Sequence, residues 1–326
     1  LLDRIVAAGT PPIHRVTFRY GDDATVDIDL ADPLYAPRRT RLDPIIADAA
    51  SDAGADVRYG VTVEDLVIDA SGRVRGVRAR HRGGERFEAH ATITVGADGM
   101  RSTLARQVGA PATHVGRVSS SFIYGYYAGV PLDGIEWLYA PGASAGLIPT
   151  DDGQVCAFVA TGSPRFMREL RHDLHGAFDG LMAQVSPRAA GLLAAGRRVG
   201  RLRGAPAVPG WLRRPYGAGW ALVGDAGYFK DPQSAHGITD ALRDAELLAR
   251  AVDDGLSGRA PMASALARYE AVRDDLSLPL FQAVEAVSAY DWTLEEVRTH
   301  HLAMSAAMRR EVRHVADLDA IAIAAA

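Results

Sequence analysis

The segment that most constrains this chain spans residues 220–252, where a strand, a Gly-containing loop and a helix follow one another. Trp220-Ala221-Leu222-Val223 is a short apolar run, which is typical of a buried strand. Gly224-Asp225-Ala226 follows it, and a helix is expected to begin at about Gly237. Apolar residues at helical spacing predict the buried face of this helix: Ile238, Ala241, Leu242, Ala245, Leu248, Ala249 and Val252.

This arrangement suits a bound cofactor. The carboxylate of Asp225, at the end of a strand, could accept hydrogen bonds from ligand hydroxyls such as those of a ribityl chain. Glycines let a ligand approach the backbone closely, and the free N–H groups at a helix start favour a negative oxygen or a phosphate. The same residues also fit a plain strand–loop–helix connection in which Asp225 only forms a turn.

Composition narrows the class of protein. The 326 residues can bury a large core, and 48% hydrophobic with 23% charged residues is typical of a globular protein. A net charge of −4 argues against nucleic acid or an anionic membrane as the main partner. No stretch reaches the roughly 18 apolar residues that a membrane-spanning helix needs, and we expect a cytoplasmic location.

Two residue types occur once. Cys156 is the only cysteine, which excludes intrachain disulfides and Cys-rich metal sites, and we expect it to be a buried, inert thiol. No residue pattern indicates any other metal site. Lys230 is the only lysine, and its place in the loop after Asp225 predicts a solvated side chain.

The rest of the chain alternates between strand and helix signals. Leu1–Gly9 is typical of the last turns of a helix closed by Gly, so we expect the chain to begin inside a fold. Residues 14–20 and 24–30 predict a hairpin around Gly21-Asp22-Asp23, and Asp43-Pro44 predicts a helix start. Further strands are expected at 57–68, 74–80, 87–95, 115–130, 135–139, 145–148 and 155–161, and helices near 102, at 165–194 and from 263 onward.

This order predicts α/β plus α+β architecture with a split first domain. Residues 1–110 and 205–262 form the first domain and flank a sheet-rich second domain at 111–204. The hairpin at 14–30 is assigned to the second domain, and residues 263–326 form C-terminal helices.

The loop–helix segment resembles the "GD" motif of the aromatic-hydroxylase family of FAD-dependent monooxygenases, a group that includes relatives of flavin halogenases and geranylgeranyl reductases. The matching residues are Gly224-Asp225-Ala226, Pro232, His236-Gly237-Ile238, Ala241 and Asp244-Ala245. The resemblance implies that Asp225 binds the ribityl chain of FAD. It also implies that Gly224, Pro232, Gly237 and Ile238 contact the cofactor.

Two further segments resemble this family. Asp98-Gly99, within residues 95–106, is similar to its "DG" motif, which implies a place near the flavin pyrophosphate and a link to NAD(P)H. Alone, the pair would be an ordinary turn with a helix cap. Arg39 matches the Arg of an Arg-x-x-Leu-Asp segment that contacts FAD, although a solvated basic turn is the plain alternative. Val63 matches a backbone contact to adenine.

One expected feature is missing. A dinucleotide fold opens with a strand, Gly-x-Gly-x-x-Gly and a helix, and this pattern is absent. We therefore expect a Rossmann-like FAD/NAD(P)-binding domain that is N-terminally incomplete, with an inserted antiparallel-sheet substrate domain and a helical C-terminus. This chain by itself is expected to bind FAD weakly.

The second domain carries candidate substrate residues. Strand alternation places Phe122, Tyr124 and Tyr126 on one face, and Trp137 and Tyr139 share a face of the next strand. These aromatic side chains could line a pocket for an apolar or aromatic substrate, or they could be core.

The resemblance implies a reaction. NAD(P)H would reduce FAD, O2 would add to give a flavin hydroperoxide, and an apolar or aromatic small molecule would be hydroxylated. His236 is the best titratable candidate for catalysis, with helix capping or packing as the alternative.

Three functions are alternatives to hydroxylation. Flavin halogenases carry Trp-x-Trp-x-Ile-Pro, but Ser144 and Gly146 precede Ile148-Pro149 here, which argues against halogenation. A flavin-dependent reductase of isoprenoid-type double bonds, or a non-catalytic remnant that acts as a scaffold, stays open.

Overall fold

The computed structural model describes residues 1–21, 24–205 and 207–325, and these form two compact units. The first unit contains Leu1–Val57, Ser120–Ala207 and Ser288–Arg298. The second contains Arg58–Ser119, Val208–Val287 and Thr299–Ala326. Of the expected hairpin turn, Asp22 and Asp23 lie outside the described residues.

The first unit is built on a seven-stranded sheet in the order β12-β8-β11-β10-β9-β1-β2. Its strands are β1 (Pro12–Tyr20), β2 (Ala24–Tyr35), β8 (Ser120–Ala128), β9 (Ile135–Ala140), β10 (Ala143–Thr150), β11 (Gln154–Gly162) and β12 (Arg197–Ala205). The predicted hairpin is confirmed, because β1 and β2 pair antiparallel. The sheet is not wholly antiparallel as expected, since β1 also pairs with β9 in parallel, with Val16 opposite Ile135.

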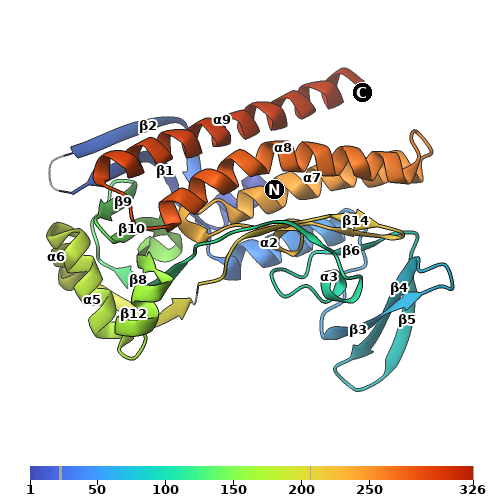
Figure 1. Ribbon diagram of the computed structural model, residues 1–326, viewed down its shortest axis with the longest axis horizontal. Helices are drawn as coiled ribbons and strands as arrows, with labels where there is room; N and C mark the ends of the chain where they lie inside the picture. Colours follow the sequence, from blue (N-terminus) through green and yellow to red (C-terminus); the bar gives the residue numbers. More distant parts are fainter. Residues whose placement is uncertain (22–23, 206, 326) are drawn as a thin grey trace. The chain divides into compact units, whose positions relative to one another are not determined.

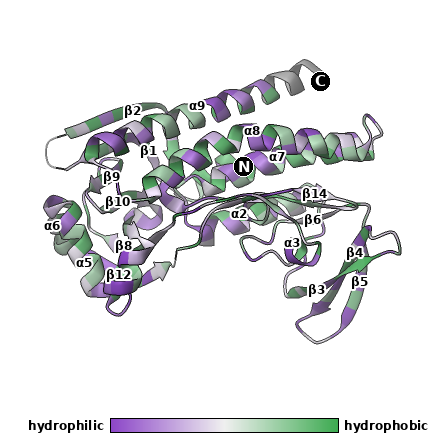
Figure 2. Ribbon diagram, in the orientation of Figure 1, coloured by the Kyte–Doolittle hydropathy of each residue, from purple (hydrophilic) through white to green (hydrophobic). Residues whose placement is uncertain are grey.

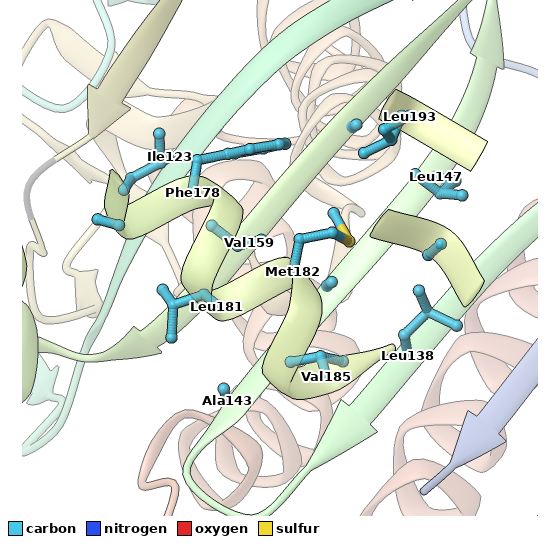
Figure 3. Packing of buried hydrophobic residues seen from close by; sticks show 14 of the residues in the cluster. Ile123, Leu138, Ala143, Leu147, Val159, Phe178, Leu181, Met182, Val185 and Leu193 are labelled. Carbon is cyan, nitrogen blue, oxygen red and sulfur yellow. The ribbon is translucent and has the colours of Figure 1, made fainter. Parts of the chain in front are cut away.

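Helices α5 and α6 cover one face of this sheet (Figure 1). The helices of the unit are α1 (Leu2–Ala7), α2 (Arg39–Asp52), α4 (Ser163–Arg165), α5 (Leu174–Val185) and α6 (Pro187–Ala195). Figure 3 shows Phe178, Leu181 and Met182 of α5 packed against Ile123 and Val159 of the sheet. This core buries alternate residues of each strand, so the other residues of β8 and β9 point to the opposite face.

Two helix predictions need correction. Helix α2 begins at Arg39, before the expected cap Asp43, and Pro44 lies inside it. Asp43 pairs with Arg39 instead of capping. Pro44 is the sixth residue of the helix, so it lacks an N–H that would otherwise donate to the carbonyl of Thr40. The expected helix at 165–194 is interrupted, since Asp173 caps α5 and Ser186 caps α6.

The second unit contains three small sheets, ordered β3-β4-β5, β14-β15-β6 and β16-β13-β7. Their strands are β3 (Val61–Ile68), β4 (Val74–His81), β5 (Arg86–His90), β6 (Thr94–Gly96), β7 (Ala112–Val115), β13 (Trp211–Arg213), β14 (Tyr216–Gly217), β15 (Trp220–Leu222) and β16 (Tyr228–Phe229). Two expected strands are each divided. Residues 87–95 give β5 and β6, and residues 115–130 give the end of β7 and, in the first unit, β8.

The helices of the second unit are α3 (Thr103–Gln107), α7 (Gly237–Leu256), α8 (Met262–Ser288) and α9 (Leu294–Ala325), the last two continuing into residues of the first unit. Within the second unit, α7, α8 and α9 lie side by side (Figure 1) and share polar contacts. Every long helix in Figure 2 mixes hydrophilic and hydrophobic residues, and no described helix is long and apolar enough to cross a membrane.

The buried face of α7 differs from the prediction. Ile238 and Leu242 are exposed, whereas the buried residues are Asp240, Arg243, Asp244, Leu247, Leu248 and Ala251. The apolar periodicity misled because buried ion pairs, not apolar packing, face inward over the first half of the helix.

The limits of the two units differ from the expected domain limits. Residues 1–57 as a whole belong with the seven-stranded sheet, and residues 111–119 and 263–287 belong to the second unit. Which residues serve the cofactor and which serve the substrate stays a prediction.

Candidate functional site

The strands that lead into the two glycine–aspartate motifs lie next to each other in the second unit. β6 and β15 pair in parallel, with Leu222 opposite Gly96, and the N–H of Val223 donates to the carbonyl of Gly96 at 3.0 Å. Because parallel strands end at the same edge, Asp98 and Asp225 both follow the carboxyl end of this pair. In α/β sheets that edge is where ligands bind.

Asp98 has a clear local role. Its Oδ2 accepts hydrogen bonds from the N–H of Thr103 at 2.6 Å and of Leu104 at 3.4 Å, so its carboxylate caps α3. Ser102 assists, since its Oγ accepts from the N–H of Ala105 at 3.0 Å. This fixes the turn at Gly99, which has a φ of +73° and open space where a Cβ would lie.

Asp225 lies in the short 3-10 turn Gly224–Ala226 at the end of β15. Gly224 has a φ of +58°, and a Cβ there would lie 3.3 Å from the Cβ of Ala241. Arg213, which sequence reasoning missed, contacts this turn and lies near enough to Asp98 to be affected by its charge. Arg213 donates to the carbonyl of Ala226 at 2.9 Å; burial lowers its pKa, and the charge of Asp98 opposes that shift.

The start of α7 is open. Gly237 and Ile238 are exposed, and a Cβ on Gly237 would meet no atom within 4 Å. His236 occupies the N-cap position, but its side chain makes no capping hydrogen bond. The first N–H groups of this 20-residue helix have no acceptor within the helix, and an anion that approaches this exposed turn could accept from them.

The loop before α7, residues 230–236, is fixed by a buried ion pair between Lys230 and Asp240. Pro232 is exposed and begins a 3-10 turn, which is followed by Ala235 with a strained φ of +48°. Lys230 is buried, 5% exposed, so the prediction of a solvated lysine is wrong. Its Nζ forms an ion pair with Asp240, and burial, reinforced by the charge of Arg243, lowers the pKa of Lys230 to about 7.

A buried network of charges continues from Lys230. Arg243 donates to Asp244 Oδ1 at 2.7 Å and to Ser277 Oγ at 2.8 Å, and its Nη1 lies 3.2 Å from Glu311 Oε2. The same carboxylate oxygen lies 3.2 Å from Nε2 of His236. We call the set Lys230, His236, Asp240, Arg243, Asp244, Ser277 and Glu311 the charge network. The spacing of Asp240, Arg243 and Asp244 in the sequence places them on one face of α7. The sequence does not show that Ser277 of α8 and Glu311 of α9 are their partners.

Two predicted cofactor residues lie elsewhere. Arg39 is in the first unit, where its exposed side chain donates to Asp43 at 3.0 Å. Val63 lies on β3 of the second unit and is 44% exposed. The neighbouring carbonyl of Glu64 accepts from Gln107 of α3 at 3.1 Å, so β3 contacts the helix that Asp98 caps.

The five predicted substrate residues, Phe122, Tyr124, Tyr126, Trp137 and Tyr139, share one face of the seven-stranded sheet, opposite α5 and α6. They alternate with residues of the core shown in Figure 3. Phe18, Tyr20 and Phe158 lie on the same face and were missed; ring centroids of Phe158 lie 5.7 Å from Phe122 and 5.8 Å from Trp137. We call these eight residues the aromatic face. Tyr139 and Phe122 are buried, and the other three predicted residues are half-buried.

The two positions that distinguish halogenases lie on the aromatic face. A Cβ on Gly146 would lie 2.3 Å from Cε1 of Phe158, so Phe158 fills the space that a side chain at 146 would need. Ser144 Oγ and the hydroxyl of Tyr290 share a 2.8 Å hydrogen bond. Cys156 is half-buried on this face beside Tyr126, and burial raises its pKa to about 11.

Comparison with known proteins decides the family. The family described as FAD binding domain matches residues 1–283 of this chain. The chain belongs to the FAD-binding domain family. Digeranylgeranylglycerophospholipid reductase of Methanocella arvoryzae is 27% identical over 278 residues, which cover 82% of this chain and 68% of the reductase. Two further curated relatives are matched over 47% and 24% of their own length.

Solved structures share the fold of this FAD-binding chain. The flavin-dependent brominase Bmp2 superposes with a TM-score of 0.76 at 20% identity, over 95% of this chain and 77% of the brominase. PqsL of Pseudomonas aeruginosa, described as a "probable FAD-dependent monooxygenase", superposes with a TM-score of 0.74 at 19% identity, over 95% of this chain and 85% of PqsL. The expected mixed α/β FAD-binding fold is therefore confirmed.

The chemical groups at the carboxyl edge of β6 and β15 are of the kinds that FAD needs. The carboxylate of Asp225 could accept hydrogen bonds from ribityl hydroxyls, and the first turn of α7 could donate N–H groups to anionic oxygens. Gly99 and Gly237 leave open the space in which a cofactor could approach the backbone.

The charge network is a poor site for a metal ion, although three of its side chains could act as ligands. Ligand atoms of His236, Asp240 and Glu311 lie within 4.8 Å of one another, close enough to hold an ion. However, Lys230 pairs with Asp240, and Arg243 lies 3.2 Å from Glu311, so cations of the protein already neutralise both carboxylates. Since a metal would have to displace them against their positive charge, we assign no metal here.

Proposed function

We propose that this chain is a flavin-dependent monooxygenase that binds FAD at the carboxyl edge of β6 and β15. It would use NAD(P)H and O2 to hydroxylate an apolar or aromatic small molecule. The observation that carries the proposal is the parallel pairing of Leu222 with Gly96, because it brings two glycine–aspartate motifs to one ligand-binding edge. Bound FAD would supply electron transfer and the activation of O2.

Each group at this edge has a task that its surroundings support. Asp225 would accept hydrogen bonds from the ribityl hydroxyls, and Gly237 and Ile238 would donate backbone N–H groups to the anionic part of the cofactor. Asp98 would act through the α3 cap, holding Gly99 in the conformation that lets a phosphate approach. Arg39 and Val63 remain proposed contacts to the phosphate or ribose and to adenine.

The aromatic face would bind the substrate. Trp137, Phe158 and Tyr124 are half-buried and present flat apolar surface, which suits a planar or aliphatic molecule. His236, half-buried beside the proposed flavin edge and joined to a carboxylate, is the candidate for moving a proton.

A reductase of isoprenoid-type double bonds is the second candidate. The relative that supports it is the reductase of Methanocella arvoryzae, which matches 82% of this chain. The name of that protein describes a reduction and not an oxygenation. Halogenation is disfavoured by Ser144 and Gly146, which stand at the two Trp positions of the halogenase motif, and Phe158 leaves no room for a side chain at position 146.

Reduction and oxygen uptake separate these functions. In the first experiment, FAD-loaded protein is mixed with NADH or NADPH in the absence of oxygen, and the loss of flavin absorbance is recorded. In the second, oxygen uptake and products are measured with aromatic and prenyl test compounds, with and without bromide. A monooxygenase reduces its flavin with one of the nicotinamides and gives oxygenated product without halide. Saturated product in the absence of oxygen, or brominated product, would reject the proposal.

A further inference from the structure

The start of α7 is held by charges rather than by apolar packing. Its first three buried residues are Asp240, Arg243 and Asp244, and the first buried apolar residue is Leu247. Gly237 and Ile238, ahead of them, are exposed. The position of the turn that would face FAD therefore depends on the partners of these buried charges.

One partner comes from outside the segment that matches the family. Glu311 lies on α9, beyond the matched residues 1–283, and is 3% exposed. Its Oε2 lies 3.2 Å from both Nε2 of His236 and Nη1 of Arg243. This single oxygen thus ties the N-cap residue of α7 and the first buried arginine of the same helix to α9.

We propose that Glu311 is a positioning residue of the FAD site, which acts by holding His236 and the first turn of α7 in place. The proposal rests on the proposed function and extends it, because it makes α9 part of the cofactor site.

The charges around Glu311 support this role. Its Oε2 lies 3.2 Å from Nη1 of Arg243, and the same guanidinium pairs with Asp240 and Asp244 of α7. Burial acts to raise the pKa of Glu311, but the hydrogen bond with His236 and the charge of Arg243 outweigh it and hold that pKa below its usual range. Glu311 is thus an anion that holds the imidazole of His236, the residue directly before the exposed Gly237 and Ile238.

His236 and its partner should then act as one unit. Glu311→Gln removes the charge from the acceptor that lies 3.2 Å from Nε2 of His236, and His236→Ala removes the imidazole. Both changes end the same charge-assisted contact, so loss of both should cost little more than loss of one. A role of Glu311 in stability alone makes a different prediction: the folded variant would bind FAD as the parent does.

The experiment measures the Kd of FAD, by flavin fluorescence quenching, for the full chain and for Glu311→Gln, His236→Ala and the double variant. The temperature is kept well below each unfolding midpoint measured without FAD. We expect each single change to weaken binding by about tenfold or more, and the double change to add less than about threefold to that. The visible circular dichroism band of FAD at saturation should change in the same way in both single variants.

Arg310→Gln is the matched control. Arg310 also joins α9 to α8, through the carbonyl of Asp275 at 2.9 Å, but its contacts are exposed. This variant should bind FAD within about twofold of the parent, as expected for a surface pair. A similar loss in Arg310→Gln would assign the effect to α9 docking in general and overturn the proposal.

Other results also decide the question. If Glu311→Gln folds and keeps the affinity of the parent, or if the two losses add fully, Glu311 does not position His236. If Glu311→Gln does not fold, His236→Ala decides, because its side chain is 16% exposed and tolerates truncation better; unchanged affinity there rejects the proposal. If the parent itself binds no FAD, the proposed function fails, which is a distinct outcome.

Discussion

Leu222 and Gly96 are direct partners in a parallel strand pair, and this pairing places Asp225 and Asp98 at one edge of the second unit. The two motifs are far apart in sequence, and each alone has an ordinary structural explanation. Asp98 does cap a helix, as its plain explanation requires. Its position at the same edge as the Asp225 turn is the reason we propose a cofactor site there rather than two separate turns.

The close approach at Gly96 should make it intolerant of any side chain. A Cβ there would lie 2.8 Å from Leu104 and 2.9 Å from Leu222, both buried. We expect Gly96→Ala to lower the free energy of unfolding by about 1–3 kcal/mol, because the strand must move away from α3. Urea denaturation tests this, and an unchanged midpoint would show that the edge is looser than described.

Gly237 should behave in the opposite way. A Cβ there meets no atom within 4 Å, so Gly237→Ala should leave the unfolding midpoint almost unchanged. If FAD approaches this backbone, the added methyl group should still weaken FAD binding by about fivefold or more, about 1 kcal/mol. Thermal melting and FAD titration of the same sample give both values. Unchanged affinity would move the cofactor away from the start of α7.

The fit between Gly146 and Phe158 gives a paired prediction for the aromatic face. Gly146→Ala should destabilise the protein by about 1–3 kcal/mol, since its Cβ would lie 2.3 Å from the ring. Phe158→Leu in the same chain should recover part of that loss, so the two changes should be non-additive. Gly180→Ala in α5, where a Cβ meets nothing within 4 Å, is the control and should be neutral or slightly stabilising. Additive effects in the urea midpoints would contradict the described contact.

His301 should make the fold sensitive to acid. It is 8% exposed on α9, and burial, with a smaller effect of His300, lowers its pKa from 6.5 to about 4. The unfolded chain therefore binds more protons than the folded one between these values, and stability falls as the pH drops through this window. From pH 7 to pH 5 His301 should cost about 2 kcal/mol of unfolding free energy.

Urea denaturation at these two pH values tests the assignment. His301→Gln should lessen the acid sensitivity by that amount. His114→Gln, at an exposed position, should leave it as in the parent. Equal sensitivity in His301→Gln and the parent would show that another group carries the effect.

The sequence predicted local structure better than partners. The hairpin, the end of β15 and the start of α7 at Gly237 follow from alternation, glycine and helix signals, which act between near neighbours. The parallel pairs β6–β15 and β1–β9 join segments that are distant in sequence. The residues of such short strands do not indicate which other strand they will pair with.

The burial of Lys230 and of the charged face of α7 was missed for a related reason. A charged residue is expected at the surface unless a partner is known. Lys230 pairs with Asp240 of α7, and Arg243 contacts Glu311 on α9 and Ser277 on α8, which only the fold brings to α7.

The most direct test of the FAD site is a titration of FAD into the full chain and into Asp225→Ala. Asp65→Ala is the control, since Asp65 is an exposed carboxylate of the same unit. We predict that Asp225→Ala weakens FAD binding by about tenfold or more through loss of charge-assisted hydrogen bonds, while Asp65→Ala binds as the parent does. Equal affinity of all three proteins for FAD would contradict the assignment of the cofactor to the carboxyl edge of β6 and β15.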